Sequence, residues 1–265
     1  KIILYLCITK EEETLTFSNQ PKLCSYVCKQ FHKHEPLIFK TGSNIKLIHR
    51  AEYCKSIIAD GKELITGKES GEIRVPELND EKVYITFKED LTSLANAFSG
   101  CAKLTSIPEN LFANCPKATD FPSPSLVEGI DYHTGEIFAN KPAVTDFTNT
   151  FMNCMKLTAI PTGLFAHNPE VTDFSGTFAL CSALESIPKN IFANNRKVTD
   201  FSYTFTGCYA LTGESPYTMI GDKKVHLYER ANYPEHFTKL TVFWECFKNC
   251  TGLTDYAQIP TNWKE

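Results

Sequence analysis

The chain has 265 residues, of which 42% are hydrophobic and 12% aromatic, and its net charge is −4. This composition is that of a folded globular protein and excludes a disordered one. The chain contains no run of five or more basic residues, which argues against nucleic acid or an anionic membrane as a partner. The apolar run 2–8 is too short to cross a bilayer, so we expect no transmembrane segment there. A first strand is favoured over the remainder of an export signal, because no small-residue cleavage site follows the run.

Residues 1–90 predict a small β-rich domain that covers one end of the segment following it. Strand-like runs occur at 2–9, 14–18, 37–39, 45–49 and 83–87. Residues 57–65 predict a hairpin that turns at Asp60-Gly61, because Asp-Gly favours the tight turns that join antiparallel strands.

The most metal-like feature of this part is the cluster Cys24, Cys28, His32 and His34. In a helix, Cys24 and His32 would lie about 12 Å apart along the axis, too far to share one zinc ion with Cys28. An irregular segment would let the four side chains converge. We therefore expect no metal and no other cofactor, and keep these residues as weak candidates.

From residue 91 onward the sequence repeats with a period of about 27 residues. Good copies begin at Phe147 and Phe174, an earlier one begins at Leu94, and the pattern continues at Phe201 and resumes at Phe243. Each copy reads Phe, three residues, Phe, two residues, Cys, two residues, Leu, followed in most copies by Ile-Pro. Such a period predicts a solenoid in which each copy packs on its neighbours.

The spacing within a copy predicts two kinds of element. Phe201, Phe205 and Cys208 lie four and three residues apart, as on one face of a short helix that Asp200 would cap. Leu184 and Ile187, closed by Pro188, predict a short strand. Stacking would build a structural ladder of Phe98, Cys101, Leu104, Phe151, Cys154, Leu157, Phe178, Cys181, Leu184, Phe205, Cys208, Leu211, Phe247, Cys250 and Leu253.

The repeats resemble the BspA-like leucine-rich repeats of surface proteins from gut and oral anaerobic bacteria of the Bacteroides type. The segments that carry the resemblance are "LTSIPENLF", "VTDFSYTF" and the interrupted tail that ends in "CTGLTDYAQIP". The resemblance covers about residues 91–263. It implies an α+β fold: a leucine-rich-repeat solenoid of short parallel strands plus short helical turns. It departs from the family pattern in a worn copy at 122–136, and an insertion occupies 209–239.

The repeated cysteines and aspartates have plain structural interpretations. The cysteines lie along a line beside Phe and Leu, which favours buried, reduced thiols over a metal site or disulfides. A calcium column of Asp120, Asp146, Asp173 and Asp200 is the weaker alternative to capping, because each Asp follows Thr and precedes a helical turn.

No motif of a hydrolase, a phosphate-binding loop, a zinc protease or a nicotinamide enzyme occurs, so we expect no enzyme. The resemblance implies an exported, monomeric adhesion protein, lipid-anchored through a removed N-terminus on the outer cell surface, that binds a protein or glycan. Alternatives are a glycan-binding module of a nutrient-uptake system and a structural spacer. The 209–239 insertion supplies the binding candidates Tyr217, Tyr228, Tyr233 and His236, or forms a lid over the last copies.

Overall fold

The part of the chain that the computed structural model describes comprises residues 35–65, 68–88, 91–109, 111–112 and 143–265. These residues belong to the same compact unit, and everything below concerns that unit. The weak metal candidates Cys24, Cys28, His32 and His34, the runs at 2–9 and 14–18, and the worn copy at 122–136 lie outside the described residues.

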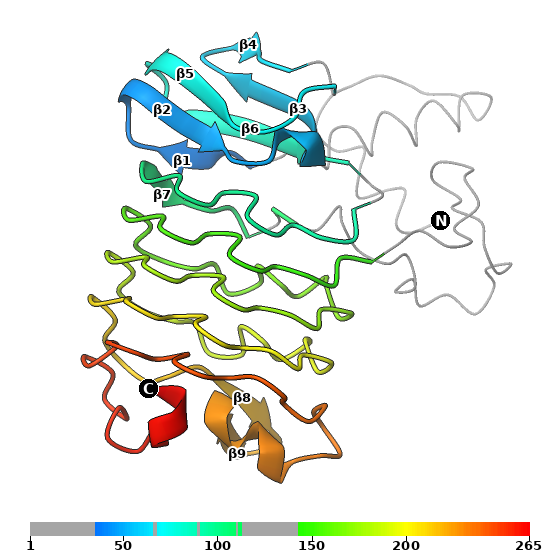
Figure 1. The fold of residues 1–265 in the computed structure, drawn as a ribbon, viewed down its shortest axis with the longest axis vertical. Coiled ribbons are helices and arrows are strands. Elements are labelled where there is room, and N and C mark those ends of the chain that lie inside the picture. The colour runs from blue at the N-terminus through cyan, green and yellow to red at the C-terminus, as the bar shows by residue number, and fades with distance from the viewer. Residues whose placement is uncertain (1–34, 66–67, 89–90, 110, 113–142) are drawn as a thin grey trace, which may run out of the picture. The chain divides into compact units, whose positions relative to one another are not determined.

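Antiparallel strands form the first section of the described chain (Figure 1). One sheet has the order β4-β3-β6-β1-β7, and β2 pairs with β5 in a second sheet. The strands are β1 (Leu37–Phe39), β2 (Gly42–Ile48), β3 (Cys54–Ala59), β4 (Lys62–Glu63), β5 (Ile73–Leu78), β6 (Lys82–Phe87) and β7 (Leu104–Ser106), with the short 3₁₀ helix η2 (Ala51–Tyr53) before β3. Since β7 belongs to the first copy of the repeat, this sheet spans the boundary expected at residue 90.

Three strand predictions in this section are confirmed. The run 37–39 is β1, most of 45–49 lies in β2, and 83–87 lies in β6. The predicted hairpin is β3–β4, in which Ala59 pairs with Lys62 and both turn residues have positive φ, 47° at Asp60 and 69° at Gly61. The strand β5 is not predicted from the sequence, because it contains Pro76, which cannot donate to a ladder and is tolerated here in a two-stranded sheet.

The predicted α+β leucine-rich-repeat solenoid, with short parallel strands plus short helical turns, is wrong. Every sheet of two or more strands in the described residues is antiparallel. Parallel pairing there occurs only as isolated bridges, such as Asp146 with Asp173 and Asp173 with Asp200. The segments expected to be helical are series of turns, and the helices that are described are short 3₁₀ segments elsewhere.

The helical spacing of the apolar residues comes from a different backbone, which we call the phenylalanine ribbon: residues 94–101, 147–154, 174–181, 201–208 and 243–250. In the copy at 147, alternate N–H groups close local turns, as Thr150 N donates to Phe147 O at 3.1 Å. The N–H groups between them donate to the next copy, as Asn149 N does to Ser175 O at 2.8 Å. A helix would use every N–H within the segment, so the ribbon cannot be one.

The expected strands at the Leu and Ile positions are shortened for a second reason. Each Ile-Pro pair places a residue without an N–H beside the would-be strand, which prevents a ladder from continuing. Ala159 and Ser186 therefore form a single bridge just before Pro161 and Pro188. The first copy does contain a strand, β7, but it pairs antiparallel with β1.

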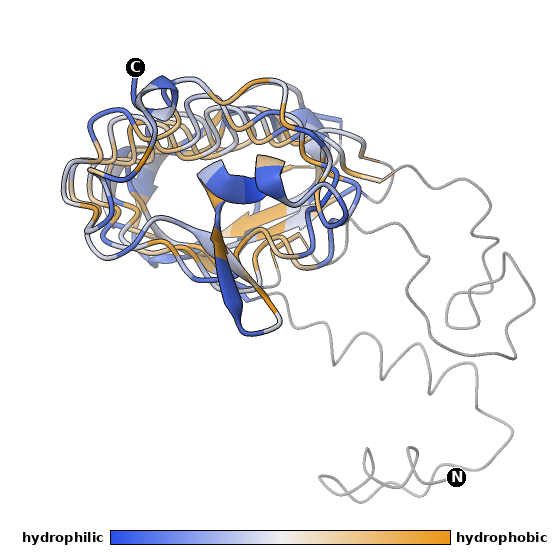
Figure 2. Cartoon of the chain, turned by 90° about the horizontal axis from the view of Figure 1, so that it is seen from below, coloured by the Kyte–Doolittle hydropathy of each residue, from blue (hydrophilic) through white to orange (hydrophobic). Residues whose placement is uncertain are grey.

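Stacked phenylalanine rings form the core of the repeats. Phe98, Phe151, Phe178, Phe205 and Phe247 make one column with ring centroids 5.4–5.8 Å apart. Other columns run through Phe147, Phe174 and Phe201 and through Phe112, Phe165 and Phe192. Seen along the stack, successive turns superpose (Figure 2). All fifteen residues of the expected ladder are buried, and the five ladder cysteines are free.

The chain after the copy at 201 forms a hairpin and two short helices that cover the end of the stack. The elements are β8 (Tyr217–Ile220), β9 (Lys223–His226), η3 (Leu227–Asn232) and, after the last copy, η4 (Thr261–Trp263). Trp263 stacks on Phe243 with ring centroids 4.8 Å apart, and its carbonyl accepts the Phe247 N–H at 2.9 Å. In the described part of the chain, no helix has the length and apolar character needed to cross a membrane.

Candidate functional site

Large apolar side chains are exposed mainly along the phenylalanine ribbon. Leu180, Tyr203 and Trp244 lie on it, while Met155 and Tyr209 directly follow its buried cysteines Cys154 and Cys208. We call the five exposed residues, Met155, Leu180, Tyr203, Tyr209 and Trp244, the ribbon patch. Their exposed fractions are 44% for Met155, 43% for Leu180 and Tyr203, 62% for Tyr209 and 57% for Trp244. Of these residues, Tyr203 and Trp244 are hydrogen-bonded neighbours in adjacent copies, and exposed apolar groups that adjoin one another are typical of interaction sites.

The backbone of the ribbon imposes a residue preference that the patch violates. The third and seventh positions of every described copy have positive φ, between 53° and 72°. Asn and Gly, which tolerate this conformation, occupy seven of these ten positions: Asn96, Gly100, Asn149, Asn153, Gly176, Gly207 and Asn249. Leu180, Tyr203 and Glu245 occupy the other three, at a cost of about 1–2 kcal/mol each.

Contacts between adjacent copies fix the patch on the stack. The Tyr203 N–H donates to the Trp244 carbonyl at 2.9 Å, which places these two residues in neighbouring copies. Leu180 lies over Gly207, where an added Cβ would approach its Cδ2 to 2.8 Å. The Lys248 Nζ lies 2.8 Å from the Glu245 Oε2, and this ion pair raises the pKa of the lysine. The backbone that carries Leu180, Tyr203 and Trp244 is therefore held by contacts between adjacent copies.

The binding residues expected from the sequence lie in the terminal hairpin and the segment after it. Tyr217 and Tyr228 both pack on His226, with ring centroids 5.8 and 5.2 Å from it. Tyr233 lies under the Lys223 ammonium, 4.9 Å from its ring centroid, and His236 lies 3.5 Å from Glu235. The structure therefore brings together two of the four candidates, Tyr217 and Tyr228.

His226 joins the hairpin to the last copy of the repeat through carboxylates. Its Nδ1 lies 3.1 Å from Glu229, and its Nε2 lies 2.9 Å from Glu214 and 3.7 Å from Asp255. Asp255 is buried and also accepts the Ser215 N–H at 2.9 Å. This cluster fastens the hairpin to the stack.

Burial affects the hydroxyl of Tyr228 in the same cluster. Its oxygen lies 3.4 Å from Asp255, and burial, followed by the negative charge of that carboxylate, raises the pKa of Tyr228 far above its usual value. The hydroxyl therefore stays protonated and can donate to Asp255. Tyr228 thus supports the junction between the hairpin and the stack, which corresponds to the lid alternative for the insertion.

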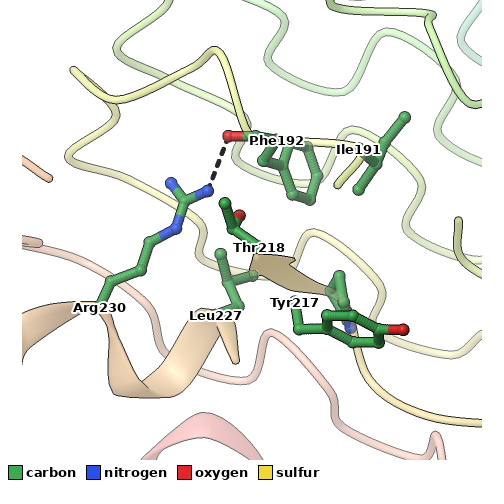
Figure 3. Close-up of a pocket in the computed structure, with 7 residues that line it drawn as sticks. Ile191, Phe192, Tyr217, Thr218, Leu227 and Arg230 are labelled. Atoms are coloured by element: carbon green, nitrogen blue, oxygen red, sulfur yellow. Dashed lines mark hydrogen bonds between the residues drawn. The ribbon is translucent and has the colours of Figure 1, made fainter. Parts of the chain in front are cut away.

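A small pocket beneath the hairpin is lined by Ile191, Phe192, Pro216, Tyr217, Thr218, Leu227 and Arg230 (Figure 3). Arg230 donates to the Phe192 carbonyl at 2.8 Å and lies over the Phe237 ring, 4.3 Å from its centroid. Burial lowers the pKa of this guanidinium to about 9. Because the pocket has no room for a water molecule, it serves as packing and cannot hold a ligand.

The repeated polar residues satisfy backbone groups. Asp146, Asp173 and Asp200 each accept the N–H two residues further on, at 2.7–2.8 Å. The ladder thiols donate to ribbon carbonyls, as Cys181 does to Phe151 O at 3.2 Å. Within the described ranges, no three His, Cys, Asp or Glu side chains are arranged to hold a metal ion.

The sequence carries a signal for the ribbon patch that the periodicity of its apolar residues does not show. Aligning the copies places Tyr203 and Leu180 in columns that otherwise contain mainly Asn and Gly. Reading those columns as positions of positive φ would have marked both residues as exceptions. These columns acquire their meaning only from the ribbon backbone, because the apolar spacing by itself also fits a helix.

The fold and the patch together define a class: a β-rich protein with stacked repeats and exposed aromatic side chains along one element of the stack. No family model, curated protein or solved structure matches the chain. The resemblance to BspA-like surface proteins therefore stays a prediction.

Proposed function

We propose that this chain is a non-enzymatic binding or adhesion protein of a bacterial outer surface, and that it presents the ribbon patch to a partner outside the cell. The observation that carries this proposal is the pair Tyr203 and Leu180: two exposed apolar side chains at positions where the backbone favours Gly or Asn. Backbone strain clusters at functional positions. Tyr203 is the clearer of the two cases, because the Leu180 side chain also packs over Gly207.

Several features support a binding role over catalysis. The perturbed thiols lie in the core, where burial raises the pKa of Cys101, Cys181 and Cys250 to about 12, so they are poor nucleophiles. The His226 cluster is engaged in holding the hairpin. The exposed rings, in contrast, lie on a rigid element, which limits the entropy lost when a partner binds.

The proposal is tested with the purified protein on an array of extracellular host and bacterial proteins and glycans. We expect saturable binding that a Tyr203→Asn/Trp244→Ala double variant loses. Tyr84→Ala is the matched control, because Tyr84 is a 37% exposed tyrosine on β6, away from the ribbon. Binding to no partner would contradict the proposal and favour a spacer, and full binding by the double variant would contradict the role of the patch.

The location on the cell needs a separate test. Antibody raised against the purified protein should label intact cells of the producing bacterium as strongly as permeabilised cells. Labelling that requires permeabilisation would contradict surface display. Incorporation of a labelled fatty acid into the protein would support the lipid anchor implied by the resemblance.

A further inference from the structure

Building on the proposed function, we infer that the aromatic part of the ribbon patch, Tyr203, Tyr209 and Trp244, binds the C–H faces of sugar rings, so that the partner is a neutral oligosaccharide. The three rings expose 43–62% of their residue surface, whereas Phe201, Phe205 and Cys208 on the same ribbon segment are fully buried. The exposed rings therefore contribute little to the core that their neighbours build.

The size of this surface favours a small ligand over a second protein. Aromatic side chains bury about 150–250 Å² each, so three half-exposed rings offer roughly 300 Å². A stable protein interface needs about 800 Å² from each partner. The aromatic surface is therefore too small to hold a second copy of this chain, whereas a single sugar ring can lie on one exposed aromatic ring.

The shape of the surface also favours a sugar over a protein as the ligand. Protein hot spots fill desolvated pockets, but the pocket beneath the hairpin has no room even for water. The ribbon is an extended row of turns, and Leu180 fills the space over Gly207 between adjacent copies. A flat pyranose can lie on an exposed ring without needing a cavity, because its C–H groups meet the negative face of the aromatic ring.

Polar groups beside the rings match the hydroxyls of a sugar. Glu245 and Lys248 follow Trp244, and the Thr206 hydroxyl donates to the Glu245 carbonyl. The Glu245 carboxylate and the Lys248 ammonium bind each other at 2.8 Å, so this pair carries no net charge. Such a pair can donate to and accept from hydroxyl groups, and it gives no preference to an anionic ligand, which favours a neutral glycan.

The test combines a neutral-oligosaccharide array with fluorescence titration of the best oligosaccharide. The chain has two tryptophans, and Trp263 is buried against Phe243 and Phe247. A ligand that stacks on Trp244 should therefore change the emission of the wild type and leave that of Trp244→Phe nearly unchanged. We expect Trp244→Ala, Tyr203→Asn and Tyr209→Ser each to weaken binding at least tenfold, and Tyr84→Ala to bind as the wild type does.

Failure of this inference is distinguishable from failure of the proposed function. Patch-dependent binding to proteins, with no oligosaccharide bound, would overturn the inference and leave the proposed function standing. Oligosaccharide binding that all three ring variants retain would overturn both the sugar site and the role of the patch. Tighter binding of acidic than of neutral oligosaccharides would overturn the assignment to neutral glycans.

Discussion

The cysteines and threonines of the repeat are hydrogen-bond donors to the carbonyls of the phenylalanine ribbon. The Thr177 hydroxyl donates to Phe147 O at 3.0 Å and to Phe174 O at 2.7 Å, and the equivalent Thr204 hydroxyl does the same one copy further on. Cys181 and Cys208 donate to the second Phe carbonyl of the preceding copy. The repetition of Cys therefore reflects a small apolar side chain that also carries a donor.

At the residue scale, we predict that the ladder thiols stay unmodified until the protein unfolds. Burial raises the pKa of Cys181 to about 12, so the reactive thiolate is nearly absent at pH 8. Iodoacetamide followed by mass spectrometry should label Cys101, Cys154, Cys181, Cys208 and Cys250 in denaturant and leave them unlabelled in buffer. Rapid labelling of these residues in the native protein would contradict the core described here.

Two substitutions of Cys181 distinguish the contribution of its S–H donor from that of the space its side chain fills. Cys181→Ala removes the S–H donor, while the Phe151 carbonyl keeps its bond from the Cys154 N–H at 3.2 Å, so the free energy of unfolding should fall by about 0.5–1.5 kcal/mol. Cys181→Ser keeps a donor and should cost less. Urea denaturation measures both variants, and an alanine variant as stable as the serine variant would show that the donor is unimportant.

At the element scale, the terminal hairpin depends on Asp255. This buried carboxylate accepts the Ser215 N–H and lies 3.7 Å from His226, so Asp255→Ala should leave a buried donor unpaired and release β8–β9 from the last copy. Hydrogen exchange should quicken over residues 213–230 and stay unchanged over β3 and β6. Protection of the hairpin in the variant equal to that in the wild type would refute this anchoring role.

Some elements of the fold could be predicted from the sequence, and the ribbon could not. Strand periodicity and the Asp60-Gly61 turn predicted β1, β6 and the β3–β4 hairpin, since these depend on local preferences. The ribbon could not be predicted in this way, because the same four- and three-residue spacing of apolar groups fits a helix and a row of alternating turns. The difference lies in where alternate N–H groups go, which only the neighbouring copy decides.

At the scale of the whole molecule, one hydrophobic core joins the antiparallel sheets to the repeats. Phe87 of β6 contacts Phe98 and Phe112, and Phe98 begins the column that ends at Phe247 under Trp263. The buried residues of both sections form one continuous cluster. The sheet and the stack should therefore unfold together.

Trp263→Ala tests this cooperativity, because it removes the cap from the phenylalanine column. We expect a loss of about 3–5 kcal/mol in the free energy of unfolding, as for other large aromatic residues removed from a core. Circular dichroism and tryptophan fluorescence should report one shared transition in the wild type. Separate transitions for the sheet and the stack would contradict a single cooperative unit.

The central claim is that the exposed rings of the ribbon serve binding at the expense of stability. Tyr203→Asn tests it most directly, because Asn tolerates the φ of 57° at this position and occupies the same column as Asn96 and Asn149. The account predicts a free energy of unfolding unchanged or raised by about 1 kcal/mol, which is a rise in Tm of roughly 2–4 °C, together with loss of oligosaccharide binding. A variant that is less stable and still binds would contradict it.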